Sequence, residues 1–178
     1  YFVRELDLKQ KIAYVEPREV DYYTQPVLDT RLKLEETRET KRFGEELVGL
    51  GAAEVSWATV AMKKIRFRSL DAIGYHPLDL PRQNLNTVAF WIQPSEGTRA
   101  QVRIAGLNPR EGMSGLRNLL ITILPLHAMC DRPDIGVILD SSNLGEPAIF
   151  LYDRYPGGLG YAERGYAIAS CNYRLSQH

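Results

Sequence analysis

The hydrophobic positions in the first half of the chain recur mainly with the two-residue period of β-strands. Residues 1–17 (YFVRELDLKQKIAYVEP) place apolar residues on both sides of a mostly polar turn at residues 7–10, which predicts a hairpin. Further strands are predicted over residues 53–70 (AEVSWATVAMKKIRFRSL) and 86–94 (NTVAFWIQP). The short segment between the hairpin and these strands, residues 20–26, is expected to end at its proline.

Two stretches between these elements are less regular. Residues 29–43 alternate Leu32 and Leu34 with charged residues, which fits a solvated strand or a short helix. Residues 71–85 contain two prolines and a glycine, so a loop is expected there. The first 95 residues are therefore predicted to be mainly β.

The pattern changes after residue 95. Residues 95–112 are polar and interrupted by glycine and proline, which predicts a boundary between domains at 1–95 and 96–178. Helical spacing follows, with Ser114 as the expected N-cap and Pro125 expected to kink or end the helix. The apolar positions that carry this spacing are Leu116, Leu119, Leu120, Ile123 and Leu124.

Strands at residues 134–142 and 148–153 and a helix at residues 161–175 complete the prediction. The predicted fold class is α+β. A β-rich N-terminal half is followed by a mixed α/β C-terminal half with two main helices.

Composition narrows the class of protein. The 178 residues are 44% hydrophobic and 25% charged with a formal net charge of zero, so any basic surface is local. The sequence contains no apolar run of about 20 residues, and no membrane association is expected. Two cysteines fit a reducing cytoplasm. The chain opens at Tyr1 without a signal peptide, in what reads as the middle of a strand, and is expected to be a fragment of a longer protein.

The stretch AIFLYDRYPGGLGYAERGYAIAS, residues 148–170, reads as strand, glycine-rich turn and helix, the order of a phosphate loop. Gly158 and Gly160 give G-x-G, but Glu163 occupies the third glycine position and the turn has no lysine. The interpretation we favour is a structural turn whose glycines supply positive φ angles. Backbone contact with a partner is the alternative.

Metal or thiol chemistry is a weaker hypothesis. His127 and Cys130 have the H-x-x-C spacing of zinc sites, and Cys171 and His178 would complete four ligands. His127 and Cys130 are also candidates for a base and a nucleophile. The alternative is that Cys130 is a small buried hydrophobic residue at the end of an apolar helix. The neighbouring residues Asp131, Arg132 and Asp134 are expected to form a structural ion-pair turn.

A cationic strand is the better candidate site. Strand alternation predicts Lys64, Arg66 and Arg68 on one face, where three cations without an intervening acid match a phosphate backbone. A plain solvated face is the alternative. The residues that would offer stacking surface are Tyr22, Tyr23, Tyr75, His76 and Trp91.

Two C-terminal motifs resemble the C-terminal region of MrfA/YprA-like ATP-dependent DEAD/H-box helicases. One is Cys-Asp-Arg-x-Asp-Ile-Gly at residues 130–136, and the other is Ile-Phe-x-Tyr-Asp-x-x-Pro-Gly-Gly-x-Gly at residues 149–160. Residues 1–26 and 73–92 also resemble the β-rich segment before the zinc-binding domain of these helicases.

The resemblance implies a four-cysteine zinc domain in which Cys130 matches one ligand. The other three family cysteines follow the last helix and are not in this sequence, and Cys171 does not match them. We therefore expect no cofactor in this chain alone, with zinc in the intact family domain and ATP at an upstream motor. The resemblance also makes the Pro156-Gly157-Gly158 stretch a structural turn.

The function expected from the sequence is that of a non-catalytic C-terminal region of an ATP-dependent DNA helicase, a cytoplasmic DNA-repair protein. Such a region would support the motor domains and contact single-stranded or partly duplex DNA. Lys64, Arg66 and Arg68 are the candidate contacts on charge pattern alone. The alternatives are a protein-interaction module without nucleic-acid binding and a small cysteine enzyme using Cys130 and His127.

Overall fold

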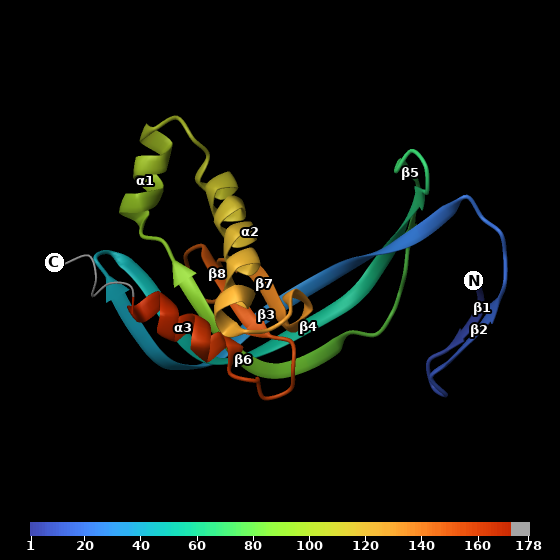
Figure 1. Cartoon of the computed structure of the whole chain (residues 1–178), viewed down its shortest axis with the longest axis horizontal. Helices are drawn as coiled ribbons and strands as arrows, with labels where there is room; N and C mark the ends of the chain where they lie inside the picture. The colour runs from blue at the N-terminus through green and yellow to red at the C-terminus, as the bar shows by residue number, and fades with distance from the viewer. Residues whose placement is uncertain (172–178) are drawn as a thin grey trace. The chain divides into compact units, whose positions relative to one another are not determined.

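The fold is seen in a computed structural model that describes residues 1–171 (Figure 1). It contains strands and helices in the order β1 (Phe2–Asp7), β2 (Ile12–Glu16), β3 (Tyr22–Phe43), β4 (Glu46–Arg66), β5 (Ala72–Pro77), β6 (Gln83–Gln93), α1 (Glu96–Ile104), α2 (Pro109–Ala128), a 3-10 turn (Arg132–Asp134), β7 (Ile135–Asp140), β8 (Ala148–Asp153) and α3 (Tyr161–Cys171). The α+β class and the strand-rich first half are confirmed. None of the described helices is both long and apolar enough to cross a bilayer.

The chain divides into two compact units, each made of two stretches. Unit 1 contains residues 1–29 and 58–81, and unit 2 contains residues 30–57 and the chain from residue 82 onward. The sheet order β3-β4-β6-β8-β7 includes strands from both sides of residue 95, and β5 also pairs with β4. The predicted domain boundary at residue 95 stays a prediction.

Unit 1 contains the predicted hairpin. β1 and β2 pair antiparallel, and the Asp7 carboxylate accepts hydrogen bonds from the backbone N–H groups of Lys9 and Gln10, both at 2.9 Å. The expected loop at residues 71–85 is wrong in part, because β5 pairs antiparallel with β4 there. Pro77 is the last residue of that strand, where a missing N–H is tolerated.

The uncertain stretch at residues 29–43 is a strand, and the expected end at Pro26 is wrong. β3 continues through Pro26 because it is the edge strand of the sheet order, where a proline need not interrupt a ladder. Side chains along most of its length are exposed, with Leu32 buried.

Unit 2 buries both faces of its central strands. Val88 and Phe90 of β6 face a core that includes Ile121 and Leu124 of α2 and Tyr166 of α3. On the other face, a second cluster joins residues from β3, β4, β6 and β8: Leu32, Val55, Trp91 and Phe150 among them. Consecutive residues of β6 and β8 therefore alternate between two cores, which explains why these segments are almost wholly apolar.

The helices depart from the prediction at their beginnings. α1 lies in the stretch expected to be an irregular boundary, with Ser95 as its N-cap accepting from the N–H of Thr98 at 3.1 Å. Asn108 caps α2, so Ser114 is not the N-cap; its hydroxyl donates to the carbonyl of Arg110. Pro125 lies inside α2, which ends three residues later. In Figure 1, α2 and α3 lie across the strands of unit 2.

Candidate functional site

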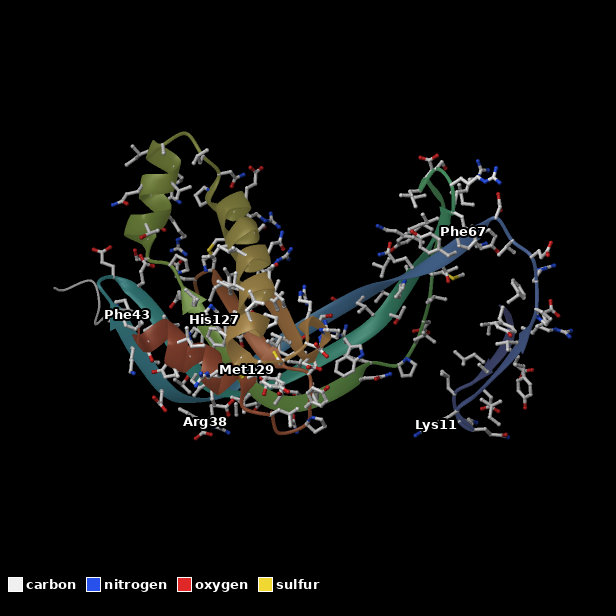
Figure 2. The ribbon with its side chains drawn as sticks, viewed as in Figure 1. Lys11, Arg38, Phe43, Phe67, His127 and Met129 are labelled. Atoms are coloured by element: carbon white, nitrogen blue, oxygen red, sulfur yellow. The ribbon has the colours of Figure 1, made fainter. Side chains whose placement is uncertain are left out.

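The three cations predicted to lie on one strand face occupy two kinds of structure. Lys64 and Arg66 are the end of β4, whereas Arg68 lies in the turn that follows. The strand therefore presents two of the cations, and the turn presents the third. Phe67, which lies between Arg66 and Arg68 in the sequence, belongs to this turn and is labelled in Figure 2.

Lys64 and Arg66 make weak interactions with residues of unit 1. The Lys64 Nζ atom lies 5.2 Å from the centroid of the Tyr22 ring, a cation–π distance. The Arg66 Nε atom lies 3.6 Å from Asp21 Oδ2, and both side chains are more than half exposed. An exposed pair of this kind contributes between zero and about 1 kcal/mol, so a phosphate could replace the carboxylate at small cost.

The predicted stacking residues separate into exposed and buried groups. Trp91 is 1% exposed and packs against Phe150 in unit 2, so its assignment as stacking surface is wrong. Tyr75 and His76 are exposed on β5. Tyr23 pairs with Phe67, with ring centroids 5.6 Å apart at an angle of 39°.

Sequence reasoning missed a groove in unit 1. It has a volume of about 920 Å³ and is lined by Phe2, Arg18, Tyr22, Tyr23, Lys64 and Phe67 together with other residues of β1, β3, β4 and the segment before β3. The signal was present in the sequence, since two aromatic residues are adjacent at Tyr22-Tyr23 and Phe67 lies between cations at Lys64–Arg68. What the pattern did not show was that the hairpin strand β1 contributes to the same groove.

Cys130 follows the end of α2 in unit 2. Met129 adopts a left-handed conformation that ends the helix, and the Cys130 N–H donates to the carbonyl of Pro125 at 3.3 Å. Figure 2 shows His127 and Met129 at this end of α2. Burial raises the pKa of the Cys130 thiol, and the carboxylates of Asp134, Asp153 and Asp131 raise it further. A reactive cysteine needs the opposite shift, so the environment does not favour a nucleophile.

A zinc site needs several donors at one point. Within residues 1–170, whose side chains the structure describes, no group of three or more His, Cys, Asp or Glu side chains could hold a metal ion. His178 and the side chain of Cys171 lie outside the described part, so the four-ligand set predicted from spacing stays a prediction. The described residues offer one thiol and do not make a zinc site by themselves.

A carboxylate of the chain itself accepts hydrogen bonds from the glycine-rich turn. The Asp153 carboxylate, at the end of β8, is fully buried and accepts hydrogen bonds from the N–H groups of Leu159, Tyr161 and Ala162 at 2.5, 3.2 and 2.8 Å. These are the donors that a phosphate loop would direct at its ligand. Gly157, Gly158 and Gly160 have φ angles of 76°, 82° and 91°, which confirms the structural interpretation.

The charged turn at residues 131–134 is also structural. The Asp131 N–H donates to the Asp134 carboxylate at 2.9 Å, and the Tyr155 hydroxyl donates to the same side chain at 2.7 Å. The 3-10 turn is thus closed by hydrogen bonds to a carboxylate, where an ion-pair turn was expected.

Comparison with known proteins identifies the class. Residues 116–175 match the family of MrfA Zn-binding domains. This region contains the C-terminal part of α2, both C-terminal motifs and α3, and the resemblance predicted from those motifs is confirmed. The chain is similar to the C-terminal region of the MrfA/YprA-like ATP-dependent helicases.

Particular relatives support this assignment. The chain is 36% identical over 165 residues to the ATP-dependent helicase YprA of Bacillus subtilis strain 168, covering 92% of this chain and 22% of the relative. The helicase MrfA bound to DNA matches with a TM-score of 0.66 and 32% identity, covering 98% of this chain and 23% of that one. A further structure of MrfA matches with a TM-score of 0.61 and 29% identity, with the same coverage. The chain thus spans about a fifth of the length of these relatives.

Proposed function

We propose that this chain is a non-catalytic part of an ATP-dependent DNA helicase, which supports the motor domains and contacts DNA through Lys64, Arg66 and Arg68. The observation that carries the DNA contact is the placement of these cations. Residues 58–70 contain four Lys and Arg residues and no acid, and they end in an exposed turn beside exposed aromatic rings. The family relation supports the rest, because a relative of this chain has been solved bound to DNA.

The cellular role that we propose follows from the similarity to the MrfA/YprA-like helicases. A cytoplasmic helicase of this family would act in DNA repair, and ATP would be used by motor domains outside this chain. Cys130 is proposed as one zinc ligand of the intact domain, with its other ligands beyond the described residues. The support for this role is that residues 116–175, which include Cys130, match the MrfA Zn-binding domain.

The DNA contact is tested by binding to a fluorescent single-stranded DNA at low and moderate salt. A variant with Lys64, Arg66 and Arg68 all changed to alanine should bind more weakly and with a shallower salt dependence, by about one counterion per lost contact. The matched control changes Lys9, Lys11 and Arg110, three exposed cations elsewhere, to alanine and should bind as the unchanged protein does. If both variants lost the same DNA affinity, the loss would be an effect of net charge, and the proposed contacts of Lys64, Arg66 and Arg68 would be rejected.

A second candidate function is docking to another protein surface. Leu119, Ile123 and Leu126 of α2 follow the i, i+4, i+7 spacing of one helix face and are 54%, 36% and 79% exposed. An interaction module with this face would show no salt-dependent DNA binding. The same titration therefore separates the two functions.

A further inference from the structure

The groove in unit 1 is lined by aromatic rings as well as cations, and contacts to phosphates would involve only the cations. Phe67 is 58% exposed and Tyr23 is 40% exposed, although their rings contact each other. Phe2 on β1 is also exposed. Soluble proteins seldom leave several large rings exposed together along one hollow unless something covers them.

Two cations lie over rings in this groove. The guanidinium carbon of Arg18 is 4.7 Å from the centroid of Phe2, and Lys64 Nζ lies over Tyr22. A nucleotide presents the complementary pair of groups, a flat π surface and a phosphate. A base can stack on a ring or on the guanidinium plane, while its phosphate stays near the cation.

The charges indicate which part of the nucleotide enters. Arg18 and Lys64 line the groove together with Glu19, and Asp21, next in sequence to the lining residue Tyr22, pairs with Arg66. A phosphate inside would lose its hydration beside a carboxylate, whereas a neutral base would not. Phosphates are better accommodated outside the groove, at Arg66 and Arg68, which are exposed and do not line it.

We propose that this groove binds unpaired nucleobases of single-stranded DNA, with Phe67 and Tyr23 as the stacking platform. The inference rests on the proposed function, because it assumes that the strand is brought to the groove by Lys64, Arg66 and Arg68. It adds a base-binding site and a preference, since bases that are stacked inside a duplex cannot reach the rings.

The test compares ordinary single-stranded DNA with an abasic strand of equal length, which has the same phosphates and no bases. The unchanged 178-residue chain should bind the ordinary strand about tenfold more tightly, which corresponds to about one stacked base. Phe67→Ala should abolish this difference and leave abasic binding and the salt dependence unchanged. Phe67→Tyr should retain it, because the ring is kept. A 2-aminopurine base in the strand should be quenched by the unchanged protein and less by Phe67→Ala.

Tyr14→Ala is the matched control, because Tyr14 is a half-exposed aromatic residue on β2 that does not line the groove. It should bind both strands as the unchanged chain does. If ordinary and abasic strands bind equally and salt still weakens both, the base site is rejected and the phosphate contacts stand. If neither strand binds, the proposed function fails and this inference fails with it. Circular dichroism of each variant excludes misfolding as the cause.

Discussion

The Oδ1 atom of Asp153 lies 2.8 Å from the backbone nitrogen of Ala162, so a buried carboxylate at the end of β8 caps the first turn of α3. The same side chain also accepts from two other N–H groups of the glycine-rich turn. One residue therefore connects the last strand of the sheet, the turn and the helix. It also explains why the N–H groups of Leu159, Tyr161 and Ala162 are not available to a phosphate.

We expect Asp153→Ala to lower the free energy of unfolding by about 3 kcal/mol, because buried N–H groups would lose their acceptor. Asp153→Asn should cost roughly half as much, since one carbonyl oxygen remains to accept. Urea unfolding followed by circular dichroism measures both. A loss below about 1 kcal/mol for the alanine variant would contradict the capping role.

Two helical glycines should respond oppositely to alanine. A Cβ atom at Gly165 of α3 would overlap the Phe90 ring, whereas one at Gly115 of α2 would meet no atom within 4 Å. Gly165→Ala should therefore destabilise the fold by about 1–3 kcal/mol through overpacking. Gly115→Ala should stabilise it by about 0.5–1 kcal/mol through helix propensity. Thermal unfolding of the two variants decides. A Gly165→Ala variant that is as stable as the unchanged chain, or more stable, would contradict close packing of α3 on β6.

Two arginines of α1 share Glu96 as a partner but differ in burial. The Arg99 side chain is 8% exposed and also pairs with Glu146, with its Nη2 2.6 Å from the carboxylate, whereas the Arg103 side chain is 51% exposed. Arg99→Ala should cost about 2 kcal/mol, because packing and charge-assisted hydrogen bonds are both lost. Arg103→Ala should change stability by less than about 0.5 kcal/mol. If denaturant titrations gave equal losses of unfolding free energy for the two variants, the buried Arg99 would contribute no more to stability than the exposed Arg103.

Stability should fall in acid partly through Asp140. Burial alone would raise the pKa of this carboxyl, but hydrogen bonds from Asn143 and Ser142 outweigh it and hold the pKa below its ordinary value of 3.8. The unfolded chain therefore takes up this proton at a higher pH than the folded chain does. The stabilisation is complete above the ordinary value and is lost as pH falls through the lower folded pKa.

Unfolding free energies at pH 5 and pH 3 test this linkage. The difference between the two should be smaller in Asp140→Asn than in the unchanged chain. Asp79→Asn is a suitable control, because Asp79 is exposed and is not a member of the hydrogen-bond network of Asp140, Ser142 and Asn143. An Asp140→Asn variant that loses as much stability in acid as the unchanged chain would remove Asp140 as a cause.

The sequence predicted best where a single local pattern determines the structure. The hairpin of β1 and β2 and the apolar strands β6 and β8 were found because periodicity and turn residues coincide there. α1 was missed because it has few apolar residues, and it depends on capping by Ser95 and on the contact between Arg99 and Glu146, which is distant in sequence. β5 was missed because its proline lies at its end, where it does not interrupt pairing with β4.

The candidate site shows the same limit. Lys64, Arg66 and Arg68 were visible because they lie within five residues of one another in the sequence. The groove beside them was not, because it needs Phe2 and Arg18 from a different part of the chain. Trp91 was misjudged because an aromatic residue in a strand gives no sign of which face is covered, and here both faces of β6 are covered. The capping role of Asp153 had a sequence signal, an acidic residue directly after an apolar strand and before a glycine-rich turn.

Trp57 and Gln83 are opposite one another in the antiparallel pairing of β4 with β6. The pairing of β4 with β6 ends at these two residues. Residues 58–81 therefore lie between two facing positions of this ladder. Insertions, deletions or wholesale exchange between these two residues need not disturb the register that places Trp91 and Phe90 in their cores. The segment that carries the cations can therefore be shortened, lengthened or replaced by a tight turn without a change in the register of β4 against β6.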